Sequence, residues 1–355
     1  FMKKLLSIVL VIGMLMSVMS MSVSAADDAT PLTEEETAFL MMRRADIDKD
    51  GAYSTKDASM LLRAAAGIIE SNDEYDLNLD GDVSLDDAQK MLRISANLDS
   101  LASKEVLFSI FDTKLDSVKK VKPGFDKAVT MVCPSIKVTT TGAPDDRLNV
   151  SNMEYKNYVN TLVNVMNSFP YNTMLDDEMK KELELMKKSA VEVYQPQTET
   201  KSVAATSNSH YTNFPVDNLG WSCNLNMDEV NTISQTVADG AIQITITLDE
   251  YTYEKTKTPY PTGSAGFSER QKLPYGKIFN IPALDETDGS VVNSMAFKNG
   301  KVIVKLDIET GDVVGVDYSY SYTSSITSPK AENSSLVMKT VTTSNVSENY
   351  EMYTK

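Results

Sequence analysis

The chain contains 355 residues, of which 42% are hydrophobic, so it can bury a sizeable core and is not disordered throughout. Its 50 acidic residues outnumber its 34 basic residues, and the formal net charge is −16. Such an acidic surface disfavours nucleic acids and anionic membranes as partners and suits cations, although solubility alone also accounts for it.

The first 25 residues, 1–25, have the pattern of a secretory signal peptide. Lys3 and Lys4 provide a positive start, residues 5–19 are almost purely apolar, and small residues precede a cleavage position before Ala26. An uncleaved membrane anchor is the alternative, but the apolar stretch is short for a membrane-spanning helix. We therefore expect a secreted, extracellular protein without membrane contact after cleavage.

A helix is predicted for residues 34–44, and an internal repeat follows it. The stretch from Asp46 to Gly51 (Asp-Ile-Asp-Lys-Asp-Gly) returns 30 positions later, from Asp76 to Gly81, as Asp-Leu-Asn-Leu-Asp-Gly. The residues after each loop also match, and each set reads as a helix. A repeat that preserves both an acidic loop and the following helix indicates a duplicated functional unit.

Each loop has the donor spacing of a calcium site. Calcium takes about six to eight oxygen ligands, and a contiguous loop supplies them when acidic side chains alternate and a glycine at the sixth position allows a sharp turn. A backbone carbonyl, a serine and a closing carboxylate complete such a cage. The sequence therefore predicts two calcium ions. The first is held by Asp46, Asp48, Asp50, the carbonyl of Ala52, Ser54 and Asp57, and the second by Asp76, Asn78, Asp80, the carbonyl of Asp82, Ser84 and Asp87.

The repeat resembles the type I dockerin family. The closing ligand of an EF-hand is normally Glu, whereas both closing residues here are Asp, and the following helices carry Met-Leu-Leu-Arg or Lys-Met-Leu-Arg. The resemblance covers residues 45–98 only. It implies a small all-α module whose folding depends on calcium and whose partner is a cohesin domain of a cell-surface or cellulosome-type scaffold.

The same resemblance places the cohesin contacts on the two repeat helices. They are Thr55, Lys56, Leu62 and Arg63 in the first unit and Leu85, Asp86, Leu92 and Arg93 in the second. The family often repeats its contact residues in both units, which permits two docking orientations, but this chain pairs Thr-Lys with Leu-Asp and so departs from that symmetry. For Leu62 and Leu92, which occupy the same position in the two units, we favour core packing between the helices over partner contact.

Residues 103–355 lack the acidic repeat, and the spacing of their apolar residues alternates between helical and strand periods. This spacing predicts an α+β domain with an antiparallel sheet. The predicted helices cover residues 104–120, 152–168, 176–189 and 227–237. The predicted strands cover residues 129–141, 241–253, 301–308, 313–323 and 335–343, with a hairpin turn at 309–312 and a polar loop at 202–212. The predicted fold class is thus α+β, with a calcium-loop module at 26–100 and this larger domain after it.

The larger domain carries no catalytic signature. His210 is the single histidine, no Gly-x-Ser-x-Gly is present, and Cys133 and Cys223 are either bonded or free. Tyr318, Tyr320 and Tyr322 share one face of a strand, either as a carbohydrate platform or, as we favour, as packed residues. Two functions remain: a non-catalytic docking protein, with polysaccharide as a second possible ligand, or a dockerin-borne hydrolase of O-glycosyl bonds in polysaccharide catabolism, which needs two carboxylates across a cleft.

Overall fold

The structure, a computed structural model, describes residues 32–96, 98–205, 225–256, 260–262, 267–270, 272–284, 290–328 and 335–353. The residues from Glu35 onward form one compact unit. Among the helices in the described ranges, none combines the length and the apolar character needed to cross a bilayer. The predicted signal peptide lies outside the described residues.

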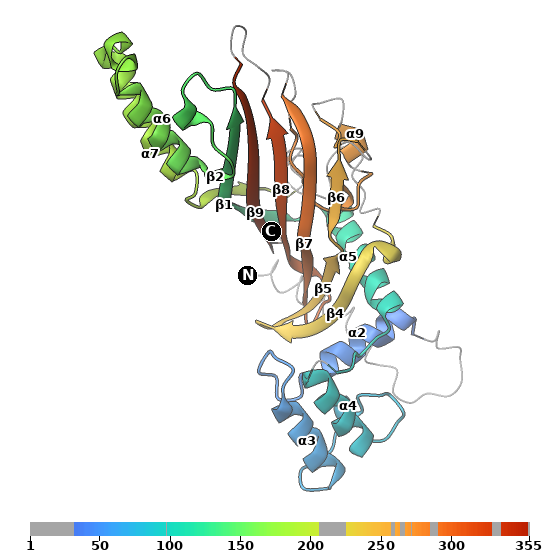
Figure 1. The fold of residues 1–355 in the computed structure, drawn as a ribbon. Helices are drawn as coiled ribbons and strands as arrows, with labels where there is room; N and C mark the ends of the chain where they lie inside the picture. Colours follow the sequence, from blue (N-terminus) through green and yellow to red (C-terminus); the bar gives the residue numbers. More distant parts are fainter. Residues whose placement is uncertain are drawn as a thin grey trace. The chain divides into compact units, whose positions relative to one another are not determined.

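The repeat folds as two equivalent loop–helix units. They follow helix α2 (Glu34–Arg44) and end in α3 (Thr55–Ala65) and α4 (Leu85–Ser95), which lie side by side (Figure 1). Ser54 and Ser84 cap these two helices, and each forms a capping box with the aspartate three residues later. The predicted helices of the repeat are therefore confirmed, and the same local chemistry starts both.

The rest of the chain is built on one antiparallel sheet. Its strands pair in the order β2-β1-β9-β8-β7-β5-β4, while β3 pairs with β1 and β6 with β7. The strands are β1 (Gly124–Thr141), β2 (Met153–Glu154), β3 (Gln197–Val203), β4 (Val230–Ala238), β5 (Ala241–Leu248), β6 (Tyr251–Glu254), β7 (Val291–Asp307), β8 (Val313–Thr327) and β9 (Val337–Tyr353). The predicted antiparallel α+β domain is confirmed.

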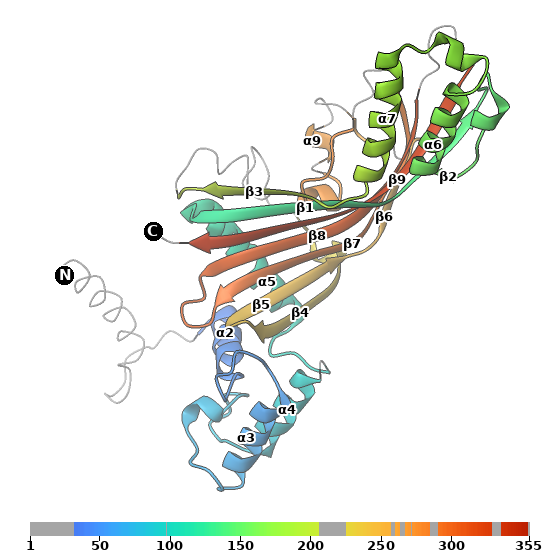
Figure 2. The ribbon, with the colours of Figure 1, turned by 90° about the vertical axis from the view of Figure 1, so that its left-hand side faces the viewer.

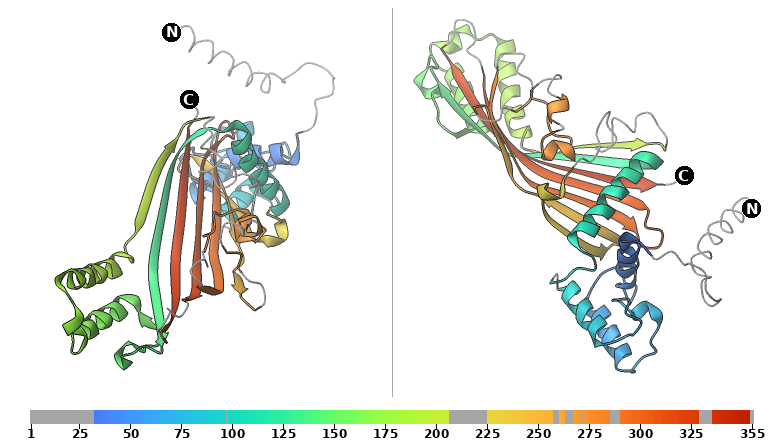
Figure 3. Two further views of the ribbon diagram at one scale, coloured as in Figure 1. Left: turned by 90° about the horizontal axis from the view of Figure 1, so that it is seen from above. Right: turned by 90° about the vertical axis from the view of Figure 1, so that its right-hand side faces the viewer.

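Helix α5 (Lys104–Val121) covers one face of the sheet. It lies in front of the strands in the right panel of Figure 3 and behind them in Figure 2. Its buried side chains recur at helical spacing and pack on apolar residues of β4, β7 and β8. They are Leu107, Ile110, Phe111, Leu115 and Val118. The opposite face of the sheet carries mainly polar side chains in the middle strands, as expected for a sheet covered on one side.

A helical hairpin of α6 (Tyr155–Met166) and α7 (Asp177–Glu192) lies beside the far end of β1 and encloses its own small core. Short helical pieces complete the described chain. They are Asp73–Tyr75, Asp146–Leu148, Tyr171–Met174, Met227–Glu229, Phe267–Arg270 (α9) and Tyr275–Lys277. The helices predicted at 152–168 and 176–189 are confirmed, with small shifts of their ends.

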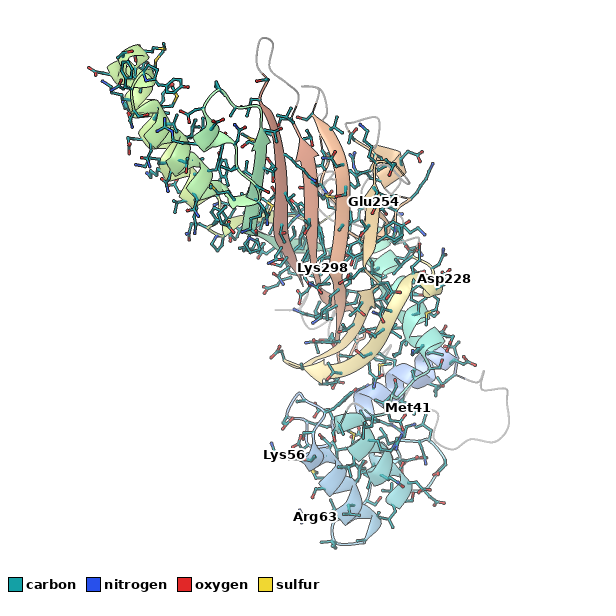
Figure 4. All side chains as sticks on the ribbon, viewed as in Figure 1. Met41, Lys56, Arg63, Asp228, Glu254 and Lys298 are labelled. Carbon is teal, nitrogen blue, oxygen red and sulfur yellow. The ribbon has the colours of Figure 1, made fainter. Side chains whose placement is uncertain are left out.

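The main hydrophobic core is continuous from the repeat module to the sheet. Met42 of α2 and Leu61 of α3 belong to the same buried cluster as Leu306 of β7. Polar contacts accompany this packing: the Ser100 hydroxyl donates to Gln235 of β4 at 2.6 Å. Figure 4 labels Met41 on α2, between the module and the strands. The boundary predicted near residue 100 is therefore not a break in the core.

One predicted element is wrong. Residues 227–237 were expected to be a helix, but Val230–Ala238 forms strand β4 and only the three residues before it make a helical turn. Its β-branched residues alternate, and Ile233 and Val237 are buried on one face, which is a period of two. Gly240 lies in the β4–β5 turn with a φ of 72°.

The strand predictions were incomplete. The strand expected over 241–253 is divided into β5 and β6, β7 begins ten residues before the strand expected over 301–308, and β9 continues to Tyr353 beyond the strand expected over 335–343. The short strand β2 and the edge strand β3 were not predicted. The sequence of β3 has no apolar alternation, because its side chains are nearly all exposed, and so it does not predict a strand. Most of the predicted polar loop at 202–212 lies outside the described residues.

Candidate functional site

The first repeat loop gathers three carboxylates. One oxygen from each of Asp46, Asp48 and Asp50 lies within 4.8 Å of the others. The backbone turns sharply here, with a φ of 56° at Lys49 and 85° at Gly51. The Gly51 amide donates to Asp46 Oδ2 at 3.0 Å, which holds the first carboxylate over the turn. The loop therefore brings these oxygens close together, and the cluster could hold a metal ion.

A second observation at this loop also points to a cation. Asp46 is only 6% exposed, and its Oδ1 atom is buried with no hydrogen-bond partner. Burial raises the pKa of the Asp46 carboxyl, and the neighbouring Asp57, Asp48 and Asp50 charges raise it further. A buried anionic oxygen without a donor is costly, and a bound cation removes that cost. The donor set, all oxygen, is the kind that calcium prefers.

Asp57, the predicted closing ligand, is fully buried and already strongly bonded. Its Oδ1 accepts from the amides of Ile47 (2.8 Å) and Asp48 (3.2 Å), and its Oδ2 from the amide and hydroxyl of Ser54. These four bonds use the lone pairs of the carboxylate. Asp57 can reach a cation only by releasing one donor, and the rotatable Ser54 hydroxyl at 3.1 Å is the easiest to release.

The second loop repeats the scaffold but differs in the hydrogen bonds of its first carboxylate. Asp87 accepts from the amides of Leu77 (2.9 Å), Asn78 (3.1 Å) and Ser84 (2.8 Å), just as Asp57 does in the first loop. Both oxygens of Asp76, however, have amide donors, Asp80 at 3.2 Å and Gly81 at 2.9 Å. The second loop therefore has the backbone of the first without its unpaired buried oxygen, and a second ion remains a prediction.

The charges around the first loop include a competing cation. Lys56 Nζ lies 3.0 Å from Asp50 Oδ2, and this contact lowers the pKa of the Asp50 carboxyl. In the second unit the equivalent position is Asp86, which adds negative charge next to its loop. The two loops therefore present different electrostatic fields to a cation.

The helices of the module enclose an apolar groove of about 510 Å³. It is lined by Thr55, Ala58, Ser59, Leu62, Leu85, Ala88, Gln89 and Leu92. The side chains of Leu62, Leu85 and Leu92 are 48%, 65% and 51% exposed, which is high for large apolar residues. Our preference for core packing of Leu62 and Leu92 is therefore wrong. The helices instead bury Leu61 and Met91, one residue earlier in each unit.

Half of the predicted partner residues line this groove, namely Thr55, Leu62, Leu85 and Leu92. The other four are exposed beside it: Lys56, Arg63, Asp86 and Arg93. Figure 4 shows Lys56 and Arg63 projecting outward from α3. Sequence analysis missed the small and polar lining residues Ser59 and Gln89, although their spacing from Thr55 and Leu85 places them on the same helix face.

Three acidic residues of the larger domain already have local partners. Glu154 forms an ion pair with Lys137, Asp176 caps α7, and Asp307 accepts from backbone amides of the turn after β7. His210 and Cys223 lie outside the described residues, so neither a role for His210 nor a bond to Cys133 is tested. Tyr318 and Tyr320 are 2% and 4% exposed, which confirms that the first two rings of the tyrosine run are packed.

Comparisons with known proteins add no relative. No protein-family model, curated protein or solved structure matches this chain. The function must therefore be inferred from the loops and from the groove between α3 and α4.

Proposed function

We propose that this protein is a secreted, calcium-dependent docking protein whose α3–α4 groove binds a cohesin-type domain of an extracellular scaffold. The observation that carries the proposal is the pairing of two equivalent loop–helix units with an exposed apolar groove between their helices. Exposed apolar surface of this kind commonly marks a protein interface. Through this groove the module would attach the α+β domain to the scaffold.

The residues of the first loop fit a calcium ion. Asp46, Asp48 and Asp50 would hold it, with the Ala52 carbonyl, Ser54 and Asp57 completing the set as predicted. The ion would supply positive charge to a loop whose carboxylates otherwise repel one another. The protein's own part is to fix the start of α3, since Asp57 links the loop backbone to the helix cap. Calcium would thus keep the two helices in position for docking.

The first residues of the two helices that line the groove differ in charge and polarity. Thr55 and Lys56 begin α3, whereas Leu85 and Asp86 begin α4, so a half-turn of the partner would exchange a polar, positive end for an apolar, negative one. Such an exchange costs complementarity. We therefore propose one preferred docking orientation.

The test is binding of the mature chain to a panel of cohesin domains, measured by titration calorimetry with calcium and with a chelator. Leu62→Ala and Leu92→Ala should each weaken binding about tenfold or more, because each removes a large apolar contact from the interface. Leu98→Ala is the matched control, since Leu98 is 68% exposed but does not line the groove. Absence of binding to any cohesin in calcium would refute the proposal.

A further inference from the structure

The covered face of the sheet contains a trough that the docking function does not use. It has a volume of about 480 Å³, lies across β8, β9, β1 and β3, and is bounded on one side by Asn280 and Pro282. This volume is within the range of small-molecule binding sites, about 300 to 1,000 Å³. The hydroxyl of Tyr320 donates to the Asn280 carbonyl at 3.0 Å, so the bounding segment is fixed to the sheet.

The strand register determines what the trough offers a ligand. One row across the strands runs Tyr320, Val346, Met131 and Gln197, and the next runs Tyr318, Glu348, Val129 and Glu199. The floor is therefore an apolar strip with a tyrosine at one side and an amide and carboxylates along it. Tyr322, which is partly exposed, extends the aromatic side.

Glu348 is the decisive residue in this trough. It is only 5% exposed, yet it lines the trough. Its partners, the Tyr350 hydroxyl at 2.7 Å and Lys127 Nζ at 3.3 Å, both contact Oε2. Within the described residues, Oε1 accepts no hydrogen bond from the protein. This largely buried carboxylate therefore keeps one oxygen that can accept a hydrogen bond from a molecule in the trough.

We propose that this trough binds a neutral oligosaccharide chain. Sugar hydroxyls can donate to Glu348 Oε1 and Glu199, while the apolar faces of the rings lie on Val129, Met131 and Tyr322. The two carboxylates repel fatty acids, phosphates and other anions, because Lys127 is already paired with Glu348. The trough opens to solvent, so an oligosaccharide can enter it.

Two variants test the contact residues. Glu348→Gln replaces the acceptor with a mixed donor and acceptor, and Tyr322→Ala removes the partly exposed ring. Each should weaken oligosaccharide binding about tenfold or more, as expected for a charge-assisted hydrogen bond or a stacked ring. Because Glu348 is buried, circular dichroism must show that its variant is folded. Glu199→Gln avoids that concern, since Glu199 is exposed on the edge strand β3, and it should weaken binding by a smaller factor.

The experiment is calorimetric titration of the mature chain with cello-, xylo- and manno-oligosaccharides at up to millimolar concentration. Glu351→Gln is the matched control, because Glu351 lies one register step beyond Tyr350 on the opposite face and should leave affinity unchanged. The proposal is overturned if no neutral oligosaccharide binds, or if the trough variants bind it as well as the parent does. Spermidine and decanoate are titrated as a cationic and a fatty-acid ligand. If only one of these binds, and the trough variants lose that binding, the proposal is also overturned. Cohesin binding should be unchanged throughout, since no trough residue belongs to the α3–α4 groove.

Discussion

The unpaired oxygen of Asp46 predicts an unusual response to the conservative substitution Asp46→Asn. Without metal, this change removes a negative charge from a buried position beside Asp48, Asp50 and Asp57. The amide oxygen of Asn can still accept from Gly51, and its NH₂ group can donate to a neighbouring carboxylate of the loop. We expect the metal-free variant to be more stable than the parent by about 1 to 2 kcal/mol, the cost of an unsatisfied buried polar atom.

With calcium the sign should reverse. A ligand at a hundred times its dissociation constant stabilises the folded state by about 2.7 kcal/mol. Asp46→Asn should lose most of that contribution at the first loop, which exceeds the gain from removing the unpaired oxygen. The variant should therefore be less stable than the parent by about 1 kcal/mol in saturating calcium.

The assay is urea unfolding of residues 26–355, followed by circular dichroism with chelator and with calcium. Asp76→Asn is the matched control at the same position of the second loop, where both carboxylate oxygens already accept amide hydrogens. It should destabilise the protein in both conditions, because it replaces an acceptor with a donor. If Asp46→Asn destabilises the protein equally with and without calcium, the inferred role of the unpaired oxygen is wrong.

Two further predictions concern the loop and the core. Lys56→Ala should tighten calcium binding at the first loop by up to about fivefold, because Lys56 competes with the ion for Asp50. Lys56→Arg keeps the positive charge and should leave the affinity unchanged. Calorimetry that gives the same calcium affinity for Lys56→Ala and the parent would contradict this. Phe111→Ala should lower the free energy of unfolding by about 3 to 5 kcal/mol, since this ring is fully buried between α5 and the sheet. Phe108→Ala, at a partly buried neighbour, should cost clearly less, and equal urea midpoints for the two variants would refute the packing argument.

Local sequence signals predicted the repeat module well. Glycine at the sixth loop position and serine before each helix determine the turn and the cap through contacts only a few residues apart. What they could not give is the fine rotation of α3 and α4. Leu61 and Leu62 are adjacent and equally apolar, and only packing against the other elements decides that the first is buried and the second exposed.

The sheet shows the opposite balance. Its long strands alternate clearly, so β8 and β9 were predicted in part, but β4 was taken for a helix and β3 was missed. The trough could not have been predicted, because Glu348, Val129 and Glu199 come from three strands whose register is set by long-range pairing. In the same way, no sequence pattern reveals that Tyr350 and Lys127 occupy one oxygen of Glu348 and leave the other.

The uninterrupted core between Met42 and Leu306 bears on how the protein would act once attached. Many modular proteins present their domains on a swinging tether, so that each domain explores a wide volume around its anchor. Here the packed side chains of the shared core join the repeat module to the sheet in place of a flexible linker. A scaffold that binds α3 and α4 would consequently fix the orientation of the whole sheet. A polymer bound to one face of the sheet would then lie at a constant angle to the scaffold.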